Sequence, residues 1–442
     1  SSALPPPSAA AAAAAPLEEA APRQAVRLPA RPEASPLPPA AGDGRDILVQ
    51  AFNWESHSSG SHWRDLAEQV SLLKELGATA VWLPPPTDAV DRMGYLPRDL
   101  FCLDSAFGSQ GDLRALVQRL RGEGIVPVAD AVLNHRCASC QDGSGVWNVF
   151  GGRLAWDARA VVGDDPHFCG RGQRASGENF HAAPNMDHSQ EFVARGYTEW
   201  LRHLQEDIGF EGWRLDFVKG YSGQHVKAYM EATRPQFAVG EYWDSLAYGD
   251  DGAPHHNQDA HRQRIVDWVN STGALCTAFD VTTKGVLHAV FERSEWWRLR
   301  DRDGRAPGLL GWWPSKAVTF LENHDTGSTQ GHWRFPHRCE EAGYAYTLTH
   351  PGVPSLFWDH LHDGHLRPKI RALVAVRRRC DVHSRSPLSI DAADGEKYAA
   401  YVRGDRCQLA LRLGSGHWGP SGSGWEVAYE GDRCTVWVQD EG

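Results

Sequence analysis

The feature that most constrains the fold is an alternation of short apolar segments with helical patterns, which runs from Ile47 to about Arg379. Hydrophobic residues between these segments recur at three- and four-residue spacing, as at Leu66, Val70 and Leu73, which predicts amphipathic helices. The expected strands are Ile47–Phe52, Ala80–Pro84, Ile125–Asn134, Gly212–Phe217, Phe237–Trp243, Leu275–Val281, Ala317–Asn323 and Val353–Trp358. Eight strands that alternate with helices predict an α/β fold, a (β/α)8 TIM barrel.

Three further segments flank or interrupt this barrel, which is expected over residues 43–134 and 189–383. Residues 1–42 are rich in Ala and Pro, so we expect a disordered tail, either a linker or the remnant of a transit segment. Residues 135–188 lack periodicity, which predicts a loop domain inserted after the third strand. Residues 384–442 predict a C-terminal antiparallel β-domain. Its expected strands are Lys397–Val402, Gln408–Leu413, Glu426–Tyr429 and Cys434–Val438.

Composition narrows the function classes. The net charge of -11, without any basic run, argues against nucleic acid or an anionic membrane as a partner. No stretch approaches the roughly 18 apolar residues of a membrane span. Eighteen Trp are unusual and suit carbohydrate, because aromatic faces stack on sugar rings. Nine scattered Cys favour a reducing compartment, and the Cys137–Cys140 pair is expected to be two ordinary loop thiols rather than a metal or redox site.

The strand Gly212–Phe217 carries Arg214 and Asp216 toward its carboxyl end. Because these residues are two apart, both side chains point to the same side, which in a barrel is the interior mouth. A guanidinium favours the anionic form of a neighbouring carboxylate, and an anionic carboxylate suits a nucleophile. Taken alone, this pattern fits a structural ion pair better than a catalytic group. The ends of the other strands reverse that preference.

Polar residues also follow three other strands. The third strand ends in the stretch Asp130–His135, the fifth leads to Glu241, and the seventh leads to His324 and Asp325. The carboxyl ends of barrel strands meet at one mouth, so these groups are expected to lie together with the Arg and Asp of the fourth strand. Three of the carboxylates, Asp216, Glu241 and Asp325, with two His and one Arg are what cleavage of a glycosidic bond requires: a nucleophile, an acid/base and charge stabilisation.

These strand ends resemble the characteristic segments of the α-amylase family of glycoside hydrolases, and the resemblance extends from Ile47 to Gly442. The segments that look like plant-type α-amylases are Gln50–Glu55, Val81–Pro86, Gln258–Gln263, Gly311–Pro314 and Asn323–Gln330. Gly151–Leu154 and Asn179–Pro184 look most like the chloroplast branch. The resemblance therefore implies a monomer in a chloroplast or other plastid, with the cytoplasm as the alternative, that acts on starch and maltooligosaccharides.

The resemblance also implies roles, residue by residue. Asp216 matches the nucleophile, Glu241 the proton donor and Asp325 the transition-state stabiliser. The residues that match sugar ligands in the cleft are Tyr95, as a stacking platform, with His135, Arg214 and His324; Lys219 and Trp243 are expected on the leaving-group side. Trp312 and Trp313 match a surface platform for starch, and adjacent Trp residues cannot easily both be core. We expect the pKa of Glu241 to be raised by burial and by the neighbouring carboxylates.

The resemblance weakens at calcium. Plant-type α-amylases hold a structural Ca²⁺ with an Asn, two Asp and backbone carbonyls. The matching positions are Asn134, Ala175 and Asn185, with the carbonyls of Glu178 and Gly220, so both carboxylates are absent. Anionic oxygens raise calcium affinity, so a weak or vacant site is expected unless Asp187 or the Glu178 side chain substitutes.

Three functions remain open from the sequence. The first is an endo-acting, retaining hydrolase of α-1,4-glucosidic bonds. The second keeps the same site but transfers the glycosyl unit to another sugar. The third is a catalytically silent starch-binding protein, against which the intact Asp216, Glu241 and Asp325 argue.

Overall fold

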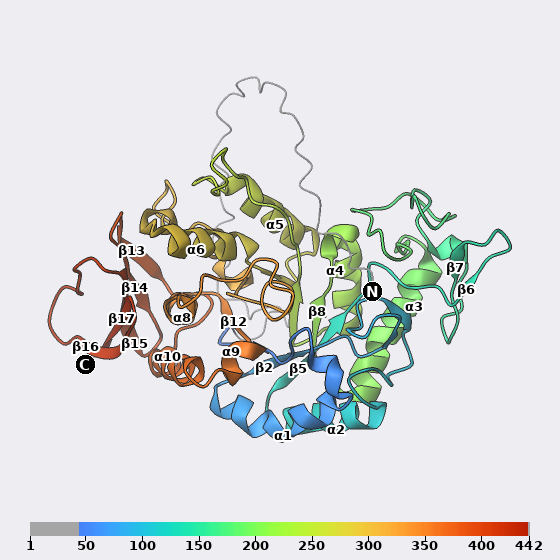
Figure 1. The fold of residues 1–442 in the computed structure, drawn as a ribbon, viewed down its shortest axis with the longest axis horizontal. Helices are drawn as coiled ribbons and strands as arrows, with labels where there is room; N and C mark the ends of the chain where they lie inside the picture. The colour runs from blue at the N-terminus through green and yellow to red at the C-terminus, as the bar shows by residue number, and fades with distance from the viewer. Residues whose placement is uncertain (1–43, 441–442) are drawn as a thin grey trace. The chain divides into compact units, whose positions relative to one another are not determined.

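The computed structural model of the chain describes residues 44–440, so the expected tail of residues 1–42 lies outside the described residues. Eight parallel strands close into a barrel in the order β1-β12-β11-β10-β9-β8-β5-β2, which confirms the predicted fold (Figure 1). The barrel strands are β1 (Leu48–Gln50), β2 (Ala80–Leu83), β5 (Val126–Ala131), β8 (Gly212–Leu215), β9 (Phe237–Gly240), β10 (Thr277–Phe279), β11 (Ala317–Thr319) and β12 (Val353–Phe357).

All eight predicted strands are present, but most of them end earlier than the apolar pattern suggested. Strand β8 ends at Leu215 and β9 at Gly240, so Asp216 and Glu241 lie just beyond the sheet. The apolar residues after these ends, Phe217, Tyr242 and Trp243, are partly buried in the following loops instead of continuing the ladder. The residues expected to do chemistry therefore stand on the first positions of loops, directly supported by a rigid strand.

Helices cover the outside of the barrel. The longer ones are α1 (His62–Glu75), α2 (Gln110–Gly122), α3 (Glu191–His203), α4 (Gly223–Thr233), α5 (Asp259–Ser271), α6 (Val281–Arg293), α8 (Glu340–Thr349) and α10 (Leu366–Cys380), with short α7 (Leu309–Trp312) and α9 (Trp358–His362). Local sequence sets several of their ends. In α2, Ser109 and Asp112 form a reciprocal capping box. After α3, a π-helical turn (Leu204–Ile208) ends at Gly209, whose φ of 104° suits glycine.

The register between strands places charged residues side by side. In the parallel pairing of β5 with β8, Asp130 lies opposite Arg214, and in the pairing of β8 with β9, Leu215 lies opposite Gly240. This register brings a second carboxylate, from the middle of the third barrel strand, into the neighbourhood of the Arg214 guanidinium. A small hairpin, β3 (Asp88–Ala89) with β4 (Pro97–Asp99), holds Tyr95 in its turn.

The segment expected to be an inserted loop domain contains little regular structure. It holds a short hairpin of β6 (Cys140–Gln141) and β7 (Trp147–Val149) and a 3-10 turn at Ala158–Ala160. Isolated bridges join His135 to Asn185 and Val161 to Met186. Backbone hydrogen bonds outside regular strands also tie the segment to itself, as from the Arg136 N–H to the Pro184 carbonyl, and to the barrel side, as from the Glu178 N–H to the Lys219 carbonyl. Its exact boundaries, 135–188, stay a prediction.

The C-terminal part forms an antiparallel sheet in the order β13-β14-β15-β17-β16, as predicted for the β-domain. Its strands are β13 (Leu388–Ala393), β14 (Lys397–Arg403), β15 (Cys407–Gly414), β16 (Glu426–Gly431) and β17 (Cys434–Asp440). Strand β13 was not among the predicted strands. The register of β13 against β14 shifts between Ile390 and Ala392, and β13 is an edge strand in which only Ala393 is buried, so its apolar signal is weak.

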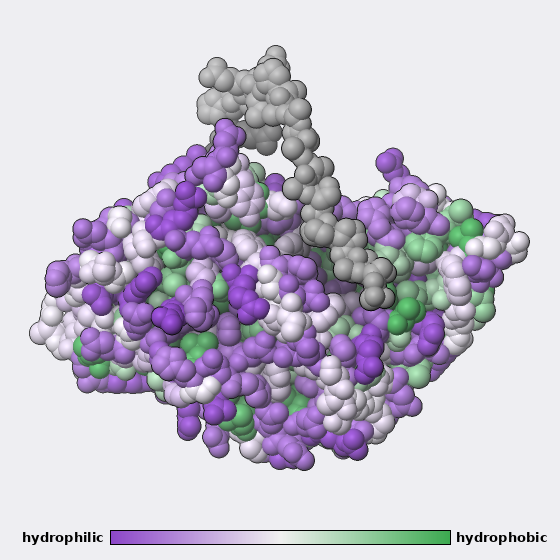
Figure 2. Space-filling model, viewed as in Figure 1, coloured by the Kyte–Doolittle hydropathy of each residue, from purple (hydrophilic) through white to green (hydrophobic). Residues whose placement is uncertain are grey.

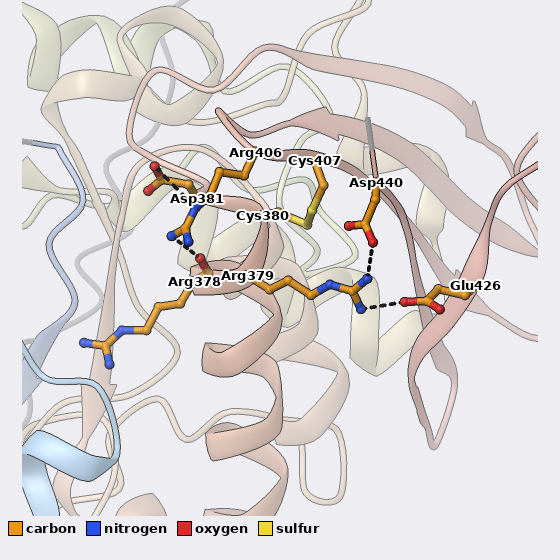
Figure 3. The surroundings of a disulfide bond; sticks show 8 residues. All are labelled: Arg378, Arg379, Cys380, Asp381, Arg406, Cys407, Glu426 and Asp440. Carbon is orange, nitrogen blue, oxygen red and sulfur yellow. Dashed lines mark hydrogen bonds and ion pairs between the residues drawn. A yellow bond between two sulfur atoms is a disulfide. The ribbon is translucent and has the colours of Figure 1, made fainter. Parts of the chain in front are cut away.

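A disulfide between Cys380 and Cys407 joins the end of α10 to the start of β15 (Figure 3). The sequence analysis expected thiols in a reducing compartment and did not identify this pair, whose members are 27 residues apart. Next to it, Arg379 contacts Glu426 at 2.6 Å and Asp440 at 2.8 Å, so charged contacts reinforce the link (Figure 3). Cys137 and Cys140 are free thiols.

The face of the molecule drawn in Figure 2 is largely hydrophilic, with apolar residues in small separated areas. Among residues 44–440, no helix is both long enough and apolar enough to cross a bilayer.

Candidate active site

The three predicted catalytic carboxylates follow three different barrel strands. Asp216 follows β8, and its backbone N–H donates to the Ala131 carbonyl of the neighbouring strand end. Glu241 follows β9, and its N–H donates to the Leu215 carbonyl. Asp325 lies in the loop after β11 and is more exposed, with 41% of its side chain accessible. Two of the acids are thus held at the barrel mouth by hydrogen bonds of their own backbone.

Arg214 connects the acids at the centre of this mouth. Its Nη1 lies 2.7 Å from Asp216 Oδ1 and 2.9 Å from Asp130 Oδ1, and its Nη2 lies 2.8 Å from Glu241 Oε1. The guanidinium is 1% exposed and lies over the rings of Trp82 and Tyr95. A planar group with several donors is suited to hold two carboxylates at a fixed relative position. The structure thus brings together Arg214, Asp216 and Glu241, as predicted.

Glu241 is the predicted catalytic acid whose pKa is raised by its surroundings. Burial raises the pKa of Glu241 to about 8; the positive charge of Arg214 opposes this shift, and the negative charges of Asp216 and Asp325 add to it. The backbone N–H of Phe217 donates to Glu241 Oε2 at 3.1 Å and orients the carboxyl group. At neutral pH Glu241 is therefore mostly protonated, which is the form a general acid needs.

Asp130 is the functional residue to which the sequence analysis assigned no role. Its carboxylate is fully buried and accepts hydrogen bonds from Trp82 Nε1 at 3.0 Å and Tyr95 Oη at 2.8 Å, besides contacting Arg214. Burial raises the pKa of Asp130, although Arg214 counteracts the shift. Asp130 orients Arg214 and Tyr95 from beneath. The sequence did contain a sign of this role, because Asp130 is a charged residue in an otherwise apolar strand. Its alignment with Arg214 follows from the register between β5 and β8.

His324 and Tyr95 form a stacked pair at the mouth. Their ring centroids are 5.0 Å apart and the rings are nearly parallel, at 2°. Gln50 Nε2 lies 2.9 Å from His324 Nδ1, and His324 Nε2 lies 3.5 Å from Asp325 Oδ2. Burial lowers the pKa of His324 to about 4, so the ring is neutral near pH 7. If Gln50 donates to Nδ1, Nε2 carries the proton and faces Asp325.

His135 lies at the same mouth, but its ring nitrogens are occupied by protein groups. Nε2 is 2.7 Å from the Tyr95 carbonyl oxygen, and Nδ1 is 3.3 Å from Asn134 Nδ2. The ring also stacks on Phe180 with centroids 4.0 Å apart. In this arrangement His135 positions Tyr95 instead of presenting a free nitrogen to a sugar, so its role as a direct sugar ligand stays a prediction.

Lys219 lies in the turn after β8, and Trp243 lies two residues after Glu241. Lys219 Nζ forms ion pairs with Glu178 Oε1 at 2.9 Å and Asp244 Oδ1 at 3.1 Å. Trp243 is partly buried and packs against Phe320. Asp244, which the sequence analysis did not select, therefore holds the Lys219 side chain together with Glu178.

Trp312 and Trp313 are separate from this cluster and both are partly exposed. Arg262 covers one face of the Trp312 ring, with its Cζ 3.7 Å from the ring centroid. Arg262 is itself buried and paired with Asp259 and Asp301. The Arg holds Trp312 in place, as a fixed surface platform would require.

The candidate calcium ligands were tested by the oxygens they could offer. Asn134 Nδ2 donates to Asn185 Oδ1 at 3.2 Å, and Glu178 is paired with Lys219. Ala175 contributes only backbone, and its N–H is bound to Asp164. In the part of the chain that the structure describes, no group of three or more His, Cys, Asp or Glu side chains could hold a metal ion. These positions thus offer amide and carbonyl oxygens without the carboxylates that a hard divalent cation prefers.

Comparisons with known proteins agree with this architecture. A family model described as the catalytic domain of α-amylase matches residues 46–144, and one described as the α-amylase C-terminal β-sheet domain matches residues 379–438. The chain is 54% identical over 90% of its length to chloroplastic α-amylase 3 of Arabidopsis thaliana, of which it spans 44%. It is 45% identical over 89% of its length to a probable α-amylase 2 of the same plant, of which it spans 94%.

The fold is also similar to that of solved structures with low sequence identity. The crystal structure of a three-domain cyclomaltodextrin glucanotransferase superimposes with a TM-score of 0.66 at 15% identity, covering 90% of this chain and 99% of the other. At that identity the comparison shows a common fold.

Proposed function

The chain belongs to the α-amylase family, and from this premise we propose that it hydrolyses internal α-1,4-glucosidic bonds of starch and maltooligosaccharides with retention of configuration. One observation carries the proposal. Arg214 lies within 2.9 Å of both Asp216 and Glu241, so a nucleophile and an acid/base are held together at one barrel mouth. This is the arrangement that double displacement at a glycosidic bond needs.

In the first step, an Asp216 oxygen attacks the anomeric carbon while Glu241 gives its proton to the leaving oxygen. The glycosidic bond breaks, a glycosyl ester forms on Asp216, and the shortened chain leaves with the proton. In the second step, Glu241 takes a proton from water, and the water oxygen attacks the anomeric carbon and releases Asp216. Two inversions give net retention. Asp325, beside neutral His324, faces the positive charge that develops on the sugar ring.

Other side chains supply binding and orientation. Tyr95, fixed by Asp130 below it and stacked on His324, is the platform for the sugar at the cleavage position. Lys219 and Trp243 line the leaving-group side, and Trp312 with Trp313 form a starch platform away from the cleft. A polar sugar with many hydroxyls matches a mouth in which charged groups alternate with aromatic faces.

The proposed steps need only water and side chains of this protein, and no step involves calcium. The positions that the resemblance assigns to calcium belong to the inserted loop and the strand ends behind it, so calcium would act on stability through a weak site. The plastid is the proposed location, supported by the chloroplastic relative. The proposed form is a monomer.

Digestion of soluble starch by the full chain tests the proposal, with products sized early in the reaction and new reducing ends counted. We expect oligosaccharides of many lengths and one new reducing end for each bond broken. Longer or cyclic products without new reducing ends would assign the site to glycosyl transfer. Starch that is bound but unchanged would identify a silent binding protein, and either result overturns the hydrolase proposal.

A further inference from the structure

Asn185, in the inserted loop, is connected to two other segments of the chain. These segments are the end of the third barrel strand region, at Asn134, and the turn after β8, at Gly220. Its side-chain amide contacts that of Asn134, with Asn134 Nδ2 donating to Asn185 Oδ1 at 3.2 Å. The Asn134 amide in turn lies directly against Gly220, where an added Cβ would overlap with it. Only glycine at position 220 permits this close approach. Three segments far apart in the sequence are therefore joined through two neutral amides.

Every hydrogen-bonding position of the Asn185 side chain is used. Nδ2 donates to Asp165 Oδ2 at 2.8 Å and to the Phe180 carbonyl at 2.8 Å. Oδ1 accepts from the Phe180 N–H at 2.7 Å and from Asn134 Nδ2. A side-chain amide offers two donors and two acceptor lone pairs, so Asn185 has none left for a metal ion.

Asp165, the carboxylate nearest to this amide, is equally committed. Its Oδ2 accepts from both the backbone N–H and the Nδ2 of Asn185, at 3.1 and 2.8 Å. Its Oδ1 accepts from the backbone N–H groups of His167 and Phe168, at 2.9 and 3.1 Å. The residue is 6% exposed, so water does not displace these donors easily. The charge of Asp165 is balanced by four N–H dipoles instead of a cation.

The two acids that could have replaced the missing ligands are also occupied. Asp187 Oδ1 accepts from the N–H and hydroxyl of Ser189, and its Oδ2 accepts from Gln173 N at 2.6 Å and Gln190 Nε2 at 2.8 Å. Glu178 forms its ion pair with Lys219. Asp187 therefore has no lone pair to spare for a cation, and one oxygen of Glu178 is engaged by Lys219.

We propose that the Asn185 amide does in this protein what a bound Ca²⁺ would do: it bridges Asp165, Phe180 and Asn134 and holds the inserted loop to the barrel without a metal. A calcium ion needs several oxygen ligands with free lone pairs, preferably anionic ones. Here the Asn185 NH₂ group points its two hydrogens at a carboxylate and a carbonyl, and so supplies the positive end of the bridge. The inserted loop is thereby fixed by calcium-independent contacts.

The network lies close to the chemistry. Gly220 is four residues after Asp216, and the Glu178 N–H donates to the Lys219 carbonyl at 2.9 Å. The loop therefore supports the turn that follows the nucleophile. This inference concerns how the fold is held and stands whether or not the proposed activity is correct.

The test is a calcium titration of the full chain after dialysis against EGTA, followed by calorimetry and by thermal unfolding. For the unaltered protein we expect no binding tighter than about 1 mM and a Tm that differs by less than about 2 °C between EGTA and 5 mM CaCl₂. Micromolar binding, or a larger fall of Tm in EGTA, overturns the proposal without any variant.

Asn185→Asp sharpens the test, because it replaces the NH₂ donor by an oxygen that faces Asp165. We expect its Tm to fall in EGTA and to recover by at least about 4 °C in calcium, since two opposed carboxylates form a hard-cation site. Asn185→Ala breaks the same contacts without adding an anion and should lose Tm equally in both buffers. Asn270→Asp, on the exposed side of α5, controls for the added charge. If Asn185→Asp responds to calcium no more than Asn185→Ala does, the amide is not in the place of a cation.

Discussion

Two polar clusters lie on the same side of this barrel and are built on opposite principles. At the mouth, the charged Arg214 is packed among carboxylates. The raised pKa of Glu241 allows that carboxyl group to gain and lose a proton near neutral pH. Where the inserted loop meets the barrel, Asn134 and Asn185 are neutral, and Asp165 has all its lone pairs satisfied by N–H groups. Charged groups that can change protonation are thus concentrated where bonds are to be broken, and neutral, saturated contacts hold the surrounding chain.

The largest effect is expected from Glu241→Gln, which removes a proton from the reactive cluster. An amide cannot protonate the leaving oxygen, so kcat on starch should fall by at least about 10²-fold while thermal unfolding is unchanged. Glu231→Gln, on the exposed face of α4, is the matched control. Activity above about a tenth of the unaltered level would remove Glu241 from the acid role and erase the contrast between the two clusters.

Asp216→Asn tests the partner of Glu241 by a different readout. A glycosyl-enzyme adduct trapped with a fluorinated substrate should be detected by mass spectrometry on the unaltered protein and vanish in the variant, because an amide is not a nucleophile toward the anomeric carbon. An adduct that persists would assign the nucleophile to another residue.

The next largest effect is expected in the pH dependence of kcat/KM, which should depend on the cluster at the mouth. Glu241 must carry its proton to act as an acid, and its pKa is raised to about 8, so kcat/KM should be retained near neutrality and fall as pH rises through that value. The slope above it should approach about tenfold per pH unit. Thermal stability measured over the same range checks that the loss is catalytic. An alkaline limb near the ordinary value of a carboxyl group would contradict the burial argument.

In the neutral cluster, Asp165→Asn should reduce stability with little effect on the shape of the pH profile. The new NH₂ group would face the donors of Asn185 and leave polar groups unpaired, which costs about 1–3 kcal/mol. Chemical denaturation of the variant and the unaltered protein measures the difference. An unchanged midpoint would show that the Asp165–Asn185 contact does not hold the loop.

The smallest effect is expected at the tryptophan platform, which belongs to neither cluster. Trp312→Ala with Trp313→Ala should weaken adsorption to starch granules and leave turnover of a short maltooligosaccharide nearly unchanged, since stacking contributes about 1 kcal/mol per ring. Trp147→Ala removes another exposed tryptophan, 51% accessible, and should not alter adsorption. Adsorption equal to that of the unaltered protein would show that the pair is structural.

Much of the fold and of the reactive cluster was predictable because both rest on local patterns. The period of apolar residues reveals strands and helices within windows of a few residues, and the barrel then brings the strand ends together without further information. Arg214 and Asp216 are two apart on one strand, so their common direction follows from pleating. The edge strand β13 was missed because only one of its residues, Ala393, is buried, which leaves a weak apolar signal.

By itself, the sequence determined the barrel and the C-terminal sheet, which of its acids would stand at the mouth, and the absence of two calcium carboxylates. Tertiary structure alone decided that Asp130 lies beneath Arg214, that Cys380 reaches Cys407, and that Asn185 saturates Asp165. The physical reason is that hydrogen bonds and disulfides are satisfied by atoms within about 3 Å in space, whatever their separation along the chain. Spacing in a sequence shows which groups could pair, and only packing shows which lone pairs are already taken.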